Sequence, residues 1–595
     1  MHDIKKIGTY SRTARYTLLS LKKASITPLI INQTDSQPYQ HQLAQWVPNT
    51  NLILVVHQNN IYLLDHQSQI VQTITENGKE NLIYNGITDM SYEEHILYSS
   101  RGFWLNSYPE GWAILYMTID ATQTDKVPFI YYAKHMNSSQ FNKEDLFSYE
   151  VPYNLNEEES ARVGLKKSIN GNAYPEISSY PYPKAGKKLP KMTMYVTKFD
   201  RENEIVYREK NVIPALGEDQ EAILSAEPAW ISSGEFGVIW TRRAQDIAII
   251  SRCKEDSSEW RCEKVTEQKM VRAGSLIVNS PPYIPKNTDK IFVILPLNEG
   301  ISGSFDHIAM ITSDGKKQYL THGSFVVTKI YYYNILRSTI YYSASSPEEP
   351  CVRHIYALTH QKNSNQRKNI RCLSCILNHT CSYADAKFTP DGRNFILECL
   401  GPEVPIYYLF DTEKEEILDV LDNSTKLRVW TKKRLMPKTR HFSIDSTRQY
   451  NIHIQLNIPA NVNEFDDAKY PLVIETARMP GIQISNFVNK VDWSRYLSSR
   501  REYITARIDT RGSAYQGDRN MFSIYKRVGE LEIEDLKTVL KNLKKLPYID
   551  HSKIAVWGQE YGGYISASFL AHEKTVACGI AISPITSWKN YCKFF

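Results

Sequence analysis

Short apolar stretches that follow a turn recur along most of the chain. Each begins with an aromatic or small residue, continues through a turn with proline or glycine, and ends in an apolar run of strand length. They begin at Trp46, Leu105, Trp230, Tyr283 and Phe388. These starts lie about 50 to 60 residues apart, or roughly twice that, which is typical of the four-stranded blades of a β-propeller. Because the repeat is degenerate, a set of unrelated hairpins is the alternative.

The pattern changes near residue 440, after which predicted strands and helices alternate. Residues 531–546 place apolar side chains on one face at helical spacing, and a second helix follows Gly558. Alternation of this kind predicts a parallel sheet with helices on its faces. The buried strands are expected at 470–476, 503–509, 553–558 and 578–583.

The turn after residue 558 resembles a nucleophile elbow without its nucleophile. The elbow pattern is G-x-S-x-G, and here Glu560 stands where the serine belongs. Gly558, Gly562 and Gly563 suit a tight strand-to-helix turn, because a side chain there would crowd the backbone. An ordinary strand-to-helix turn is the alternative.

Composition narrows the functional classes. The chain has 595 residues, 42% of them hydrophobic, so it can bury a large core in more than one domain. Its 39 tyrosines favour strands. The formal charge of +6 is spread along the chain, and we therefore expect no nucleic-acid partner. No apolar run approaches the ~20 residues of a membrane span, and the first residues lack the apolar stretch of a signal peptide.

The cysteines and sequons favour an oxidising, extracellular environment. Six cysteines form closely spaced pairs, which predict three disulfides: Cys253 with Cys262, Cys372 with Cys375, and Cys381 with Cys399. A zinc site at the C-x-x-C pair is the alternative, but a second ligand pair is missing, so we expect no metal and no cofactor. Glycosylation sequons stand at Asn32, Asn137, Asn378 and Asn423. Together with the missing targeting segment, this predicts an incomplete N-terminus.

Several motifs resemble the dipeptidyl peptidase IV group of the prolyl oligopeptidase clan, which are serine peptidases. The motifs are "NGITDMSYEEHI" (85–96), "YPYPKAG" (180–186), "CLSC" (372–375), "DTRGSAYQGD" (509–518) and "WGQEYGGY" (557–564). The resemblance covers nearly the whole chain. It implies a β-propeller of the eight-bladed type in residues 1–440, incomplete at its start, and a truncated α/β-hydrolase domain in residues 441–595.

The resemblance also assigns site residues. Of the family's two glutamates that hold the substrate ammonium, Glu94 keeps the first and His95 replaces the second, which weakens a charge-assisted clamp. Ala477 stands in place of the tyrosine of the oxyanion hole, leaving the backbone N–H of Tyr561. The positions around the family's proline pocket match Tyr564, Trp588 and Tyr591, which could equally be packing aromatics.

The resemblance predicts lost catalysis. Some α/β-hydrolases use a carboxylate nucleophile, so Glu560 alone does not exclude an enzyme. The fold supplies its acid and histidine later in the chain, however, and no aspartate follows Glu560, while His572 comes too early. We expect an inactive protein; the alternative is a proline-specific dipeptidyl aminopeptidase in a full-length or corrected form.

Relatives without the serine are auxiliary subunits of potassium channels, so the resemblance implies a protein or peptide partner, with a membrane channel as one possibility and a peptide-binding decoy as another. It also implies a cell-surface location. About a hundred residues of the family's hydrolase domain would be absent. We therefore expect residues 578–583 to form an exposed sheet edge and a homodimer to be doubtful.

Overall fold

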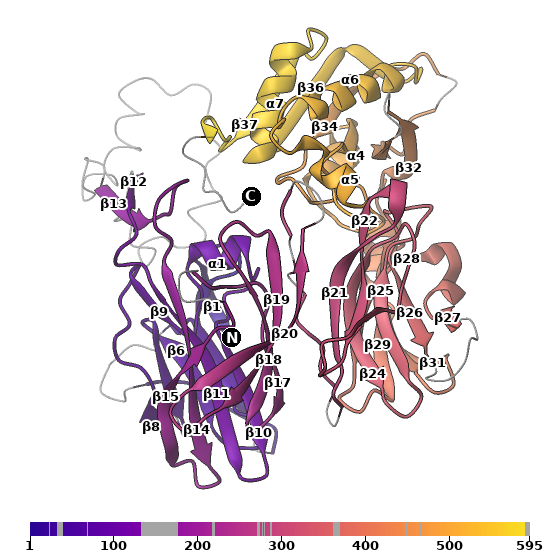
Figure 1. Ribbon diagram of the computed structural model, residues 1–595. Coiled ribbons are helices and arrows are strands. Elements are labelled where there is room, and N and C mark those ends of the chain that lie inside the picture. Colours follow the sequence, from indigo (N-terminus) through magenta and orange to yellow (C-terminus); the bar gives the residue numbers. More distant parts are fainter. Residues whose placement is uncertain are drawn as a thin grey trace. The chain divides into compact units, whose positions relative to one another are not determined.

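The computed structural model describes residues 1–595 except 23, 32–39, 68, 132–175, 217–220, 271–273, 277, 279, 286–287, 361–368, 447–449, 464–465 and 589–595. The chain divides into two compact units. Figure 1 labels their helices and strands and colours them along the sequence. Unit 1 comprises residues 1–94, 98–103 and 116–194, and unit 2 comprises residues 95–97, 104–115 and 195–595. These units differ from the two domains predicted from the sequence, whose boundary at residue 440 stays a prediction.

Unit 1 consists mainly of small antiparallel sheets. One has four strands in sequence order, β5 (Leu43–Trp46), β6 (Ile53–His57), β7 (Asn60–Leu64) and β8 (Ile70–Thr73). The paired strands are β1 (His2–Lys6) with β2 (Arg12–Arg15), β3 (Thr17–Ser20) with β4 (Ser25–Pro28), and β12 (Lys126–Tyr131) with β13 (Glu176–Pro181). Strand β9 (Ile83–Asn85) pairs with the end of β11 (Gly111–Asp120), and helix α1 spans Met90–His95.

Unit 2 before residue 425 consists mainly of antiparallel sheets, and in the first of them the strand order departs from the sequence order. The first group contains β10 (Phe103–Tyr108), β14 (Lys191–Asp200), β15 (Ile205–Ile213), β16 (Ile223–Leu224), β17 (Ala229–Ser232), β18 (Glu235–Thr241), β19 (Ile247–Glu255) and β20 (Trp260–Lys269). The next contains β21 (Ile291–Asn298), β22 (Ser304–Ile311) and β23 (Lys317–Tyr319), with a 3-10 turn at Gly300–Ser302.

Two four-stranded sheets complete this region. They are β24 (Val327–Asn334), β25 (Thr339–Ala344), β26 (His354–Thr359) with β27 (Asn369–Cys372), and β28 (Cys381–Phe388), β29 (Asn394–Pro402), β30 (Ile406–Asp411) with β31 (Glu416–Asp422). Four of the five predicted repeats fall on pairs of neighbouring strands: Trp46 ends β5 before β6, Leu105 lies in β10 before β11, Trp230 lies in β17 before β18, and Phe388 ends β28 before β29. Four antiparallel strands in sequence order are the unit of a β-propeller.

A six-stranded sheet follows, in the order β32 (Lys438–Asp445), β33 (Asn451–Ile458), β35 (Ile504–Asp509), β34 (Tyr470–Glu475), β36 (Ile549–Gln559) and β37 (Cys578–Ile582). Strands β34 to β37 run parallel, as the alternating pattern predicted. The helical elements are α3 (Thr425–Lys432), α4 (Trp493–Arg500), α5 (Asp518–Met521), a 3-10 turn at Phe522–Ile524, α6 (Leu531–Leu543) and α7 (Tyr561–His572). None of the described helices has the length and apolar run that a membrane span needs.

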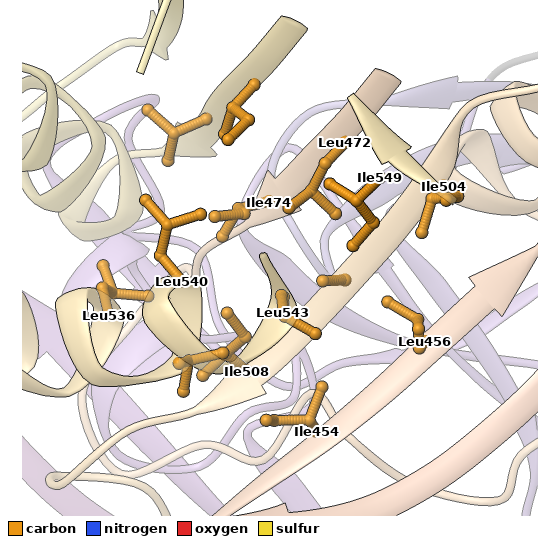
Figure 2. Packing of buried hydrophobic residues seen from close by; sticks show 14 of the residues in the cluster. Ile454, Leu456, Leu472, Ile474, Ile504, Ile508, Leu536, Leu540, Leu543 and Ile549 are labelled. Carbon is orange, nitrogen blue, oxygen red and sulfur yellow. The ribbon is translucent and has the colours of Figure 1, made fainter. Parts of the chain in front are cut away.

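The core of this sheet is one cluster of mainly aliphatic side chains. In Figure 2, Leu536, Leu540 and Leu543 project from α6 toward the side chains of the strands. All three are at most 2% exposed, so the face predicted from helical spacing is the buried face. This packing sets the position of the strands whose ends carry the candidate site.

The edge strand β37 pairs with β36 and leaves all five of its residues exposed. Ile580 is 60% and Ile582 42% exposed.

The structure forms the three disulfides that the spacing predicted: Cys253–Cys262, Cys372–Cys375 and Cys381–Cys399. Each joins two neighbouring segments of one sheet or its adjoining turn. Among the described residues, Cys351 is a buried free thiol and Cys578 an exposed one.

We predict that Leu540→Ala lowers the free energy of unfolding of the region around the parallel sheet by about 2 to 5 kcal/mol, because it leaves a cavity between α6 and the strands. Lys541→Ala is the matched control, since Lys541 is the exposed next residue of the same helix. Urea unfolding followed by tryptophan fluorescence measures both. Equal midpoints for the two variants would contradict the packing.

Candidate functional site

The turn between β36 and α7 has the backbone of a nucleophile elbow. Glu560 joins the two elements with φ 56° and ψ −113°, a backbone conformation that residues other than glycine rarely adopt. Its N–H donates to the carbonyl oxygen of Ile582 at 2.9 Å. Its own carbonyl oxygen accepts the N–H of Tyr564 at 3.1 Å and that of Ile585 at 3.2 Å. These bonds offset the strain and fix residue 560 at the tip of the turn.

Two glycines allow the loop after β34 to touch the turn. A Cβ on Gly558 would lie 2.1 Å from Thr476 Oγ1, and one on Gly562 would lie 2.6 Å from the carbonyl oxygen of Ala477. The hydroxyl of Thr476 donates to the carbonyl oxygen of Gly562 at 2.9 Å. Close approach therefore requires glycine at 558 and 562, two of the three positions singled out in the sequence.

The side chain of Glu560 is held in an ion pair. Its Oε1 lies 2.6 Å from Nη2 of Arg478, and the two side chains are 32% and 43% exposed. Arg478 follows Ala477 directly, so the cation comes from the loop that touches the elbow. The sequence analysis did not predict Arg478 as a site residue. Its position next to Ala477, which was predicted to lie at the oxyanion hole, was the signal that could have identified it.

The residues expected at the oxyanion hole lie beside this pair. Ala477 follows β34 and contributes a methyl group where the family resemblance expects a hydroxyl. Tyr561 begins α7, where backbone N–H groups lack intrahelical acceptors. Its side chain points elsewhere, because its buried hydroxyl donates to Glu532 of α6. Burial raises the pKa of Glu532, and burial next to that carboxyl raises the pKa of Tyr561 well above its ordinary value.

Two predicted pocket aromatics contact each other. The rings of Tyr564 and Trp588 meet edge to face with centroids 5.3 Å apart, and Trp588 remains 41% exposed. Tyr591 lies outside the described residues. His572 is the last residue of α7, where its Nδ1 lies 2.7 Å from the carbonyl oxygen of Ser568.

Helix α1 in unit 1 carries the predicted ammonium-binding position. Oε1 of Glu94 accepts the hydroxyl of Thr9 at 2.6 Å. The preceding Glu93, which was not predicted as a site residue, is 3% exposed, and its Oε1 accepts the backbone N–H groups of Tyr10 and Ser11 at 2.5 and 2.7 Å. His95 is half-buried at the end of the helix. The carboxylates of α1 are thus engaged by the segment between β1 and β2.

The predicted sequons are only partly described. Asn423 is exposed directly after β31, and Asn378 lies in the 3-10 helix Cys375–Thr380. Asn32 and Asn137 lie outside the described residues.

The only described group of histidine, cysteine and acidic side chains that could hold a metal ion is His354 with Cys372 and Cys375, whose ligand atoms lie within 4.8 Å of one another. The two cysteines are joined as a disulfide, so their sulfurs are not thiolate ligands. Nδ1 of His354 hydrogen-bonds with the hydroxyl of Ser374 at 2.9 Å. The donor set therefore does not fit a metal in this oxidised form.

The motif at 509–518 begins with a buried carboxyl. Oδ1 of Asp509, at the end of β35, accepts the backbone N–H of Ile484 at 2.7 Å and that of Ser485 at 3.3 Å. Burial raises the pKa of Asp509 to about 7 and that of the neighbouring Cys351 to about 12. The motif thus has a structural role in holding the loop that follows β34.

Comparison with known families decides the relationship. The profile of the dipeptidyl peptidase IV (DPP IV) N-terminal region matches residues 1–406, and that of the prolyl oligopeptidase family matches residues 489–595. The chain belongs to the dipeptidyl peptidase IV family. Its fold is accordingly a β-propeller followed by an α/β-hydrolase domain of the prolyl oligopeptidase type.

The relatives include proteins named as peptidases and one that is named as inactive. The chain is 28% identical to inactive dipeptidyl peptidase 10 of mouse, with 100% of the chain and 68% of the relative covered. It is 27% identical to bovine prolyl endopeptidase FAP, covering 100% and 72%. It is 28% identical to pig dipeptidyl peptidase 4, covering 98% and 70%. Family membership is therefore compatible with either state.

Solved structures support the fold. The crystal structure of Porphyromonas gingivalis dipeptidyl peptidase 4 superimposes with a TM-score of 0.74 at 20% identity, covering 99% of this chain and 74% of that one.

We predict that Asp509→Asn changes how stability depends on pH. Folded Asp509 keeps its proton up to about pH 7, whereas the unfolded residue loses it near 3.8, so its contribution to stability falls as pH rises between these values. Asparagine offers the same acceptor oxygen without a titrating proton. The difference between wild type and variant should therefore shift by up to about 4 kcal/mol across this interval.

Urea unfolding at pH values from about 4 to 8 measures this difference, with the wild-type stability falling relative to the variant as pH rises. Parallel pH profiles would show that the buried carboxyl does not titrate as described.

Proposed function

We propose that this family member is catalytically inactive and acts by binding a protein or peptide partner. The observation that carries the proposal is the ion pair between Glu560 and Arg478 at the tip of the elbow. A serine peptidase needs a nucleophilic hydroxyl there, activated by a neighbouring base. Here the position holds a carboxylate whose charge is already matched by a guanidinium.

A carboxylate nucleophile would have to give up this pairing before it could attack. Its Oε1 lies 2.6 Å from Nη2 of Arg478, which is the distance of a charge-assisted hydrogen bond. The lone pairs of an oxygen that accepts such a bond are engaged by the guanidinium. Loss of the serine nucleophile costs about 10⁶ in rate in a serine protease, and loss of one oxyanion donor costs about 10² to 10³. With Ala477 in place of the tyrosine, both losses apply to this chain.

Changes in α1 support the same reading. A pair of carboxylates would neutralise and orient a substrate ammonium, but His95 supplies no negative charge, and Glu94 accepts the hydroxyl of Thr9. A protonated histidine would repel the ammonium. The clamp that selects free peptide N-termini is therefore weakened independently of the elbow.

Three disulfides and the exposed sequon at Asn423 favour an extracellular or cell-surface location for this function. By family resemblance, a membrane channel is one class of partner. The alternative function, a proline-specific dipeptidyl aminopeptidase, is favoured by one observation, the elbow backbone that still places residue 560 as a nucleophile.

We predict that the purified chain does not hydrolyse a chromogenic Gly-Pro substrate, because Glu560 is ion-paired and Ala477 has no hydroxyl to donate. Pig dipeptidyl peptidase 4 is the positive control for the assay. The variants Glu560→Gln and Arg478→Ala test each partner of the pair. Turnover by the native chain that Glu560→Gln abolishes would overturn the proposal and make Glu560 a nucleophile.

The double variant Glu560→Ser/Arg478→Ala distinguishes the alternative. Serine should adopt the same backbone conformation without an ion pair, and we expect it to remain inactive. Turnover by this variant would show that the rest of the catalytic machinery is present and that Glu560 alone prevents catalysis.

A further inference from the structure

Residues 425–440, which we term the basic segment, have a composition found nowhere else in the described chain. The segment contains seven lysine and arginine residues and no aspartate or glutamate, in a chain whose net charge is only +6. It comprises helix α3 and the turn that leads into β32. Such a concentration of cations creates a local positive potential.

The helix of the basic segment has no buried face. Not one residue of α3 is buried, although the helix is strongly amphipathic. Leu427 is 37%, Val429 48% and Trp430 43% exposed, and Leu435 after the helix is 73% exposed. A surface helix normally buries its apolar stripe against the protein, so these side chains lack the contacts that an amphipathic helix makes.

The helix is nevertheless attached to the molecule in a defined way. Nε of Arg428 donates to the carbonyl oxygen of Asn423 at 2.8 Å, and its Nη2 donates to that of Val404 at 2.9 Å. The guanidinium of Arg434 lies 3.6 Å from the centre of the Trp430 ring. Arg428 thus ties the helix to the neighbouring backbone and Arg434 stacks on Trp430, while the apolar side chains stay exposed to solvent.

Four lysines of the segment have no carboxylate partner among the residues that the structure describes. Within the described residues, no carboxylate lies within ion-pair distance of Lys426, Lys432, Lys433 or Lys438. The acidic residues nearest in the chain are Asp419 and Asp422 of β31 and Asp445 at the end of β32, with Glu403 beside Val404. These are fewer than the cations of the segment, so the surface remains positive.

We propose that the basic segment binds the surface of an anionic lipid bilayer. Peptides that lie in a membrane interface combine lysines with exposed leucine, valine and tryptophan, as this segment does. In such peptides the lysines contact lipid phosphates, and the apolar side chains enter the boundary of the acyl chains. A soluble polyanion would use the lysines but would leave the four apolar side chains in water. The apolar exposure therefore favours the bilayer over a polyanion.

The test is co-sedimentation of the chain with vesicles of phosphatidylcholine alone or with about 30% phosphatidylserine, at low and high salt. We expect binding to the anionic vesicles that weakens as salt rises. Lys432→Gln/Lys433→Gln should lower the affinity by about fivefold for each lysine removed. Trp430→Ser should also lower it, because it removes an apolar group from the interface.

Lys541→Gln/Lys574→Gln is the matched control, since both lysines are exposed and lie outside the basic segment; it should bind like the native chain. Thermal melts verify that each variant is folded. The proposal is overturned by absence of binding, by equal binding to neutral vesicles, or by equal losses in the control. Binding to heparin that exceeds vesicle binding and ignores Trp430→Ser would assign the segment to a polyanion instead.

Discussion

The close contact between the loop after β34 and the turn after β36 is the constraint on which the candidate site depends. The hydroxyl of Thr476 lies 2.9 Å from the carbonyl oxygen of Gly562 and 3.1 Å from the hydroxyl of Ser566. Only glycine fits at 558 and 562, because a Cβ there would overlap this loop. The backbone of the elbow is therefore set by neighbours other than residue 560. It can keep the geometry of a nucleophile site whatever side chain stands at its tip.

The same contact explains why Arg478 reaches Glu560. The loop that supplies Thr476 and Ala477 continues into Arg478, so a cation at this position lies beside the tip of the elbow. Ala477, Arg478 and Glu560 thus share one small volume, in which Ala477 offers no hydroxyl, Arg478 supplies a cation and Glu560 supplies an anion. The tip of the elbow is therefore a paired, partly exposed polar surface on an intact fold.

Much of this fold follows from local sequence signals, and the site only in part. Glycine spacing predicts the elbow, helical periodicity predicts the buried face of α6, and cysteine spacing predicts the three disulfides, because each depends on residues close together in the chain. The ion pair of Glu560 joins residues 82 positions apart, and the bonds from Tyr10 and Ser11 to Glu93 span more than 80. Pairing over such distances depends on how loops meet in three dimensions, which periodicity and spacing do not encode. The burial that raises the pKa of Asp509 is missed for the same reason.

The most direct measurement is a crystal structure of the chain at a resolution that defines the side chains of the elbow. We predict that Glu560 retains a positive φ and that its carboxylate lies within hydrogen-bond distance of the Arg478 guanidinium. A structure in which Arg478 turns away and the carboxylate of Glu560 faces a histidine across an ordered water would contradict it, because that is the arrangement of a nucleophile with its base.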